Sequence, residues 1–233
     1  NRTFYSLSAI EKLSTEYASS EFMLVAKLLS KEFMILPSVG DDIEDYLPLQ
    51  NDPTIPASFF DWGRSKEIVY FNTLILDKGI FTPYELTRQV QLMFTLNVIA
   101  TYINDFYNRN EFVTRYLGQY TENFAQKDEV VSTFERAAKK ILTLNLDPDS
   151  YWYNKSNAFS LLCLFARRIE EVEVLDSELL RGKLVDFENS IPPDYGLAAK
   201  EGVNNKRERL IRNKHIQNLL GLEQLEQNIA QTE

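Results

Sequence analysis

Apolar residues recur along most of the chain at intervals of three or four positions, the spacing that gives an α-helix one buried face. The first such stretch follows Ser8 and Glu11, which form an S-x-x-E capping box, a pattern typical of a helix start. Its apolar positions are spaced for one helix over residues 9–31: Ile10, Leu13, Tyr17, Leu24 and Leu28. We therefore expect one N-terminal helix within residues 1–36, before Pro37 ends the apolar run.

The helical spacing is lost over residues 37–63, which contain four prolines and a cluster of acidic residues. The cluster consists of Asp41, Asp42, Glu44 and Asp45. Its spacing does not match a calcium loop, which needs alternate ligands, a central Gly and a distal Glu. We therefore predict a long Pro-rich surface loop with a solvated acidic cluster.

Helical spacing resumes at about residue 64 and continues to Gly221. The clearest start is Thr82-Pro83-Tyr84-Glu85, with Thr at the N-cap, Pro at the first helical position and Glu three residues after the Thr. One long helix is predicted from there to about Phe106, and Pro192-Pro193 predicts an extended turn. Further helices are predicted over residues 66–78, 111–124, 128–144, 154–174, 177–187 and 205–221. The expected core includes Phe94, Val98, Phe159, Leu162 and Phe165.

The composition favours the same fold class. Apolar residues make up 44% of the chain, which is enough for a sizeable core. The 8 Gly and 8 Pro are too few for the many turns of an all-β protein, and no stretch alternates long enough to predict a sheet. We predict a single all-α domain over residues 1–233, an irregular multi-helix bundle of about seven to nine helices. Its parts are the N-terminal helix region 1–36, the loop 37–63, the main bundle 64–221 and a tail 222–233.

Charge and cysteine content restrict the environment and the partners. The net charge of −9 argues against a nucleic-acid surface over the whole protein, because binding phosphates requires clustered Lys and Arg. Cys163 is the only cysteine, so an internal disulfide is excluded and a reducing compartment, the cytoplasm, is expected. No apolar run has the ~20 residues that a membrane span needs. The chain begins at Asn1 without a Met, which leads us to expect a fragment whose partner domain is missing.

Residues for a known catalytic mechanism are not found. His215 and Cys163 are the only residues of their kinds, so paired imidazoles and a structural zinc site are excluded. Cys163 lies in the most apolar predicted helix, where burial raises the pKa of a thiol and makes it inert. Phosphate-binding glycine motifs and the G-x-S-x-G motif are absent. We therefore expect no enzyme, and no catalytic, cofactor-binding or metal-binding residue.

Although the protein is acidic overall, one stretch near the end of the chain is rich in basic residues. The basic residues of this stretch are Lys206, Arg207, Arg209, Arg212 and Lys214, preceded by Lys200. Lys206, Arg209 and Arg212 are three residues apart and are expected to share a helix face. Such a face suits phosphates, acidic groups of a partner domain, contacts within the protein, or solvent alone.

Several segments follow one another in a characteristic order: Gly79 to Arg88, Asn104-Asp105-Phe106-Tyr107-Asn108-Arg109, Tyr116 to Tyr120, Tyr153 to Phe159, and Tyr195 with the Asn205 to Arg212 helix. Over roughly residues 80–220, this order resembles the helical C-terminal region of GmrSD-type restriction and phage-defence proteins. Members of that family carry an N-terminal ParB-like domain with a D-G-Q-Q-R-type motif, and some carry a C-terminal His-Asn-His nuclease. Neither feature occurs here, so the resemblance implies the helical region alone and transfers no catalytic residue.

Together these observations lead to two main expectations about function, while a third, a carboxylate-based enzyme that uses Glu170 with Glu171 or Glu173, needs a pocket that the sequence does not show. The first is a non-catalytic helical interaction or regulatory module of a bacterial defence-type protein, which couples a missing ParB-like domain to protein partners or DNA. The alternative is a nucleic-acid-binding helical protein that uses Lys206, Arg207, Arg209, Arg212 and Lys214.

Overall fold

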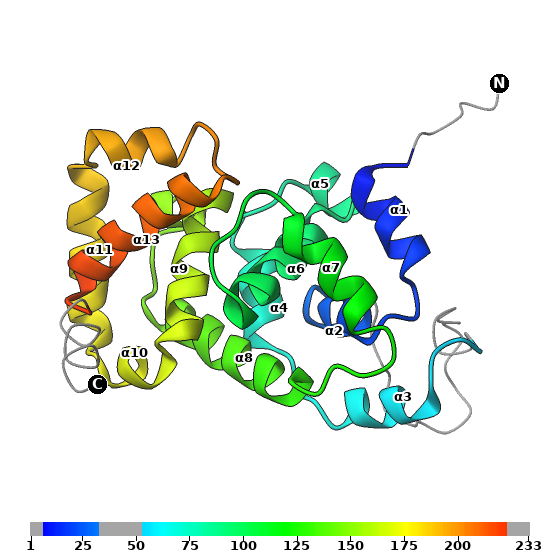
Figure 1. Ribbon diagram of the computed structural model, residues 1–233. Coiled ribbons are helices and arrows are strands. Elements are labelled where there is room, and N and C mark those ends of the chain that lie inside the picture. The colour runs from blue at the N-terminus through cyan, green and yellow to red at the C-terminus, as the bar shows by residue number, and fades with distance from the viewer. Residues whose placement is uncertain (1–6, 33–52, 223–233) are drawn as a thin grey trace, which may run out of the picture.

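The structure is a computed structural model that describes residues 7–32 and 53–222 (Figure 1). Within these ranges the regular structure is entirely helical, which confirms the predicted all-α class. The number of helices is larger than predicted, because the described residues alone contain thirteen α-helices and a short 3₁₀ helix instead of seven to nine. They are α1 Ala9–Glu16, α2 Glu21–Leu29, α3 Ala57–Arg64, α4 Tyr70–Asp77, α5 Pro83–Thr87, α6 Val90–Ile103, α7 Glu111–Gln119, α8 Lys127–Thr143, η2 Tyr151–Tyr153, α9 Lys155–Arg167, α10 Ile169–Val174, α11 Ser177–Asn189, α12 Pro193–Ala198 and α13 Lys206–Leu220.

Part of the difference arises because three predicted helices are each divided in two. The first is interrupted between α1 and α2, where Ser20 donates its hydroxyl to Leu117 O at 2.9 Å and so ties the break to α7. The second is interrupted at Gln89, whose φ of 56° is left-handed and incompatible with a continuing helix. The third changes direction at Arg168, between α9 and α10. Each break leaves the apolar spacing almost unchanged, so periodicity alone misses it.

Two other differences concern segments predicted to be irregular. Helix α3 occupies residues 57–64, so the predicted loop 37–63 is wrong over its last residues. Helix α12 starts directly at the predicted turn, because Pro193 takes the first helical position, where a missing N–H costs nothing. Residues 37–52, with the acidic cluster, and residues 223–233 of the predicted tail lie outside the described residues.

The two capping boxes predicted from the sequence are both present in the structure. Ser8 and Glu11 form a reciprocal capping box at α1, and Thr82 and Glu85 form one at α5. Gly79 follows α4 with a φ of 72°, a conformation that suits glycine. These caps supply acceptors and donors for backbone groups that the first and last turns leave unpaired.

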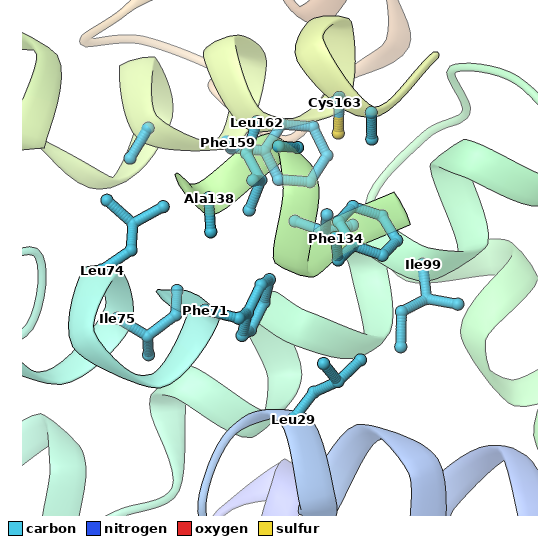
Figure 2. Close-up of a cluster of buried hydrophobic side chains, with 14 of the residues drawn as sticks. Leu29, Phe71, Leu74, Ile75, Ile99, Phe134, Ala138, Phe159, Leu162 and Cys163 are labelled. Carbon is cyan, nitrogen blue, oxygen red and sulfur yellow. The ribbon is translucent and has the colours of Figure 1, made fainter. Parts of the chain in front are cut away.

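Helix α9 lies at the centre of the packing and contacts α6, α8, α10 and α13. In Figure 2, Phe71 and Leu74 of α4 lie close to Phe134 and Ala138 of α8. The Phe71 and Phe134 rings meet edge to face at 5.9 Å. Four of the predicted core residues are buried, namely Val98, Phe159, Leu162 and Phe165, whereas Phe94 is only half-buried. The core therefore positions α9 as the surface on which α13 rests.

Candidate functional site

The five predicted basic residues lie on α13, at one end of the molecule beside α9, α11 and α12 (Figure 1). They do not form one face. Lys206, Arg207 and Lys214 are exposed, whereas only 1% of Arg209 and of Arg212 is exposed. The predicted common face of Lys206, Arg209 and Arg212 is therefore wrong. The buried stripe of α13 consists of Arg209, Arg212, Ile216 and Leu220, at helical spacing, and it packs toward α9.

Arg209 joins α13 to the loop between α6 and α7. Its guanidinium donates to Tyr107 O at 3.2 Å, to Arg109 O at 3.3 Å and to the side-chain oxygen of Asn97 at 3.2 Å. The cation also lies 4.6 Å from the ring centre of Phe159 and 5.0 Å from that of Tyr107. Such cation–π contacts strengthen when water is excluded, so they offset part of the burial of this charge. The Nε–H has no hydrogen-bond acceptor among the described residues.

Arg212 holds the segment between α12 and α13. It donates to Ala198 O at 2.5 Å and to Val203 O at 2.9 Å, and its Nε donates to the hydroxyl of Ser160 on α9 at 2.8 Å. Burial lowers the pKa of Arg212 to about 10, so the guanidinium stays charged at neutral pH. One side chain thus links α9, α12 and the loop that precedes α13.

Neither buried arginine forms an ion pair with a carboxylate of the described residues. Burial dominates the lowered pKa of Arg212, and the charge of Glu208 opposes it only in part. One Glu208 oxygen is buried without a hydrogen bond to a described residue. Burying a cation costs several kcal/mol of lost hydration. A well-placed carboxylate could offset that cost, but neither arginine has one among the described residues. Carbonyl oxygens and aromatic faces supply the compensation here.

The opposite side of α13 combines basic and apolar groups. Lys206, Arg207 and Lys214 flank Leu210, which is 41% exposed, and the half-buried Ile211. These five residues and Asn108 line a shallow groove of about 580 Å³. The Asn108 side chain accepts the Lys206 N–H at 2.9 Å, so the loop before α7 fixes the start of α13. None of the three cations forms an ion pair with a described carboxylate.

Leu210 is the apolar side chain of α13 that is exposed to solvent. The sequence pattern contains a signal for it, because Leu210 does not belong to the buried stripe of Arg209, Arg212, Ile216 and Leu220. Asn97, Asn108 and Phe159 also contribute to the environment of α13, and they come from distant segments. The spacing along the sequence could not connect them to α13.

The remaining reactive side chains are arranged for structure. His215 lies with its Nε2 2.8 Å from Asp194, and its ring packs edge-on against Tyr195 at 5.6 Å. The hydrogen bond from His215 lowers the pKa of Asp194. Complete burial raises the pKa of the Cys163 thiol to about 12, so it stays protonated at neutral pH as predicted.

Carboxylates of α10 are neutralised by neighbouring arginines. Arg136 of α8 pairs with Glu170 at 2.8 Å and with Glu173 at 2.5 Å, and Arg168 pairs with Glu171 at 2.5 Å. Each of these three carboxylates is therefore paired with an arginine. Over residues 7–32 and 53–222, no group of three or more His, Cys, Asp or Glu side chains is arranged to hold a metal ion.

No helix in the described part of the chain has both the length and the apolar character needed to cross a bilayer.

Comparisons with protein-family models, with curated proteins and with solved structures found no match for this chain.

Proposed function

We propose that this chain is a non-catalytic helical interaction module that binds an acidic protein surface through the exposed side of α13. The observation that carries the proposal is the groove in which Lys206, Arg207 and Lys214 surround Leu210 and Ile211. Apolar groups at the centre of a contact supply most of the binding energy, and charges at its rim select the partner. A carboxylate-rich partner would complement these cations, none of which forms a direct ion pair with a described carboxylate.

The resemblance to GmrSD-type defence proteins suggests which partner this is. In that arrangement the module belongs to a bacterial, cytoplasmic defence-type protein and couples a ParB-like domain to other components. The buried Arg209 and Arg212 support such a role indirectly, because they hold α13 rigidly against α9 while its outer side remains available. A rigid docking helix loses less entropy on binding than a mobile one.

The alternative function is nucleic-acid binding by the same exposed cations. Lys206, Arg207 and Lys214 suit phosphate oxygens, but Arg209 and Arg212 are too deeply buried to reach a duplex. Three cations on a protein of net charge −9 form a small electrostatic footprint for DNA. Leu210 has no role in a phosphate contact, which is why we prefer the protein partner.

The test is a pair of titrations of the full chain, one with a ParB-like domain of a GmrSD-type protein and one with a duplex of about 20 base pairs. The variant Arg207→Ala/Lys214→Ala removes two groove cations. Its matched control, Arg115→Ala/Lys139→Ala, removes one arginine and one lysine from exposed positions of α7 and α8. We expect the groove variant to weaken binding of the domain about tenfold and the control to leave it unchanged.

Two results would count against this proposal. Micromolar, salt-dependent binding of the duplex that the groove variant abolishes, with no complex with the domain, would establish the nucleic-acid function instead. Equal weakening by the groove variant and the control would show that net charge, and not this groove, determines the interaction.

A further inference from the structure

The inner side of α13 lines a cavity of about 260 Å³ between α6, α9 and the loop that precedes α13. One wall is aromatic and continuous. The Phe81 and Phe94 rings meet edge to face at 5.4 Å, and Phe94 meets Phe159 in the same way at 5.9 Å. Lys155 and Asn110, both exposed, stand at its rim, so the cavity opens to solvent there.

The other wall of the cavity carries the two buried arginines. A guanidinium has five N–H donors, and three hydrogen bonds are present for each of Arg209 and Arg212. One donor, the Nε–H of Arg209, has no acceptor among the described residues, although its side chain is only 1% exposed. Lys155 at the rim is already paired with Glu85.

A purely structural role explains only part of this arrangement. Holding backbone carbonyls accounts for four of the six hydrogen bonds and gives the arginines a place in the fold. It does not account for the unpaired Nε–H of Arg209 and an aromatic wall on either side of an open space. Buried donors without acceptors are costly, and an anion in the cavity would remove that cost.

We propose that this cavity binds a small aromatic carboxylate, with its ring against Phe94 and Phe159 and its carboxylate toward Arg209 and Arg212. Flat rings suit the aromatic wall, and a guanidinium fork matches the two oxygens of a carboxylate. An apolar cavity of about 150 Å³ holds one benzene molecule. The 260 Å³ available here therefore has room for one or two rings together with the acid group. This ligand goes beyond the protein partner proposed above and uses the opposite side of α13.

The experiment measures thermal unfolding and calorimetric binding of the full chain with 1-naphthoate, its neutral amide 1-naphthamide, and inorganic phosphate. We expect 1-naphthoate to bind with a Kd of about 1 mM or lower. At about ten times that Kd, it should raise the unfolding midpoint by about 3 °C. The amide lacks the charge and phosphate lacks the ring, so each should bind at least about tenfold more weakly.

Two variants test the site itself. Arg209→Lys keeps the charge but loses the fork, and it should weaken 1-naphthoate binding about tenfold. Val203→Phe places a ring in the cavity from a loop position and should abolish binding without removing either arginine, so it applies even if the first variant unfolds. Arg207→Ala/Lys214→Ala, which tests the partner groove, should bind 1-naphthoate normally.

Other results would overturn the assignment. Failure of 1-naphthoate to bind at concentrations several times above about 1 mM would exclude an aromatic carboxylate. Equal binding of the neutral amide would show that the arginines only support the fold. Equal binding of phosphate would show that the aromatic wall plays no part, and unchanged binding by Val203→Phe would place the ligand elsewhere.

Discussion

At the scale of single residues, burial governs the chemistry of the reactive side chains. Cys163 lies at the centre of α9 and is fully buried, and loss of hydration raises the pKa of its thiol to about 12. The nearby positive charges of Arg209, Arg167 and Arg212 act in the opposite direction, but desolvation outweighs them. Burial raises the pKa values of Tyr107 and Tyr195 as well.

The raised pKa of Cys163 predicts a loss of stability at high pH. The pKa of Cys163 rises from 9.0 to about 12 on folding, so its contribution is fully present below pH 9 and is lost as the pH rises toward 12. The single group should contribute a slope of about 1.4 kcal/mol per pH unit in that window. Cys163→Ala should remove this slope, measured by urea unfolding between about pH 8 and about pH 11. Parallel curves for the two proteins would contradict the assignment.

The two buried arginines show what residue patterns can and cannot reveal. The sequence identifies Arg209 and Arg212 as basic residues on a helix, and their spacing places them on one side of it. It does not show that this side faces α9, because an arginine is normally counted with the polar face. Several of their acceptors, Tyr107 O, Ala198 O and Val203 O, are backbone groups in loops or at a helix end, and no periodicity along the sequence describes them.

At the scale of elements, local capping determines where several helices begin. Thr82 accepts the Glu85 N–H at 3.3 Å, and Glu85 accepts the Thr82 N–H at 3.0 Å. Glu85 also pairs with Lys155, so the first turn of α5 is connected to the start of α9. The hydrogen bonds from Lys155 and Thr82 lower the pKa of Glu85.

Removing the cap gives a prediction at this scale. Thr82→Ala should lower the free energy of unfolding by about 1 kcal/mol. The Glu85 N–H loses its acceptor, and the Glu85 carboxylate loses the hydrogen bond from the Thr82 hydroxyl. Thr114→Ala, at an exposed position within α7, serves as the control and should change stability by less than about 0.5 kcal/mol. Equal losses in both variants, measured by urea unfolding, would show that the capping box contributes nothing.

Helix starts were therefore more predictable than helix interruptions. A cap is encoded by residues within one turn, and both capping boxes are present where the pattern placed them. The break at Gln89 depends on a left-handed backbone conformation that non-glycine residues adopt only when tertiary packing imposes it. Helices α10 and α12 have six residues each, too few for an apolar period to be read.

At the scale of the whole molecule, α13 separates two environments at one end of the bundle (Figure 1). Its inner side contributes Arg209 and Arg212 to the packing on α9 and to the cavity. Its outer side presents Arg207, Leu210 and Lys214. The sequence indicated the basic stretch as a whole, but only the packing of α9, α12 and the loop before α7 divides it into two sides.

The most direct test of this division compares the thermal unfolding of two double variants. Arg209→Ala/Arg212→Ala should lower the unfolding midpoint by about 10 °C or more, because six hydrogen bonds within the protein are lost. Arg207→Ala/Lys214→Ala removes the same net charge from the outer side and should shift the midpoint by about 1 °C at most. A similar shift in both variants, or a larger one in the outer variant, would contradict the assignment of Arg209 and Arg212 to the fold and of Arg207 and Lys214 to the partner surface.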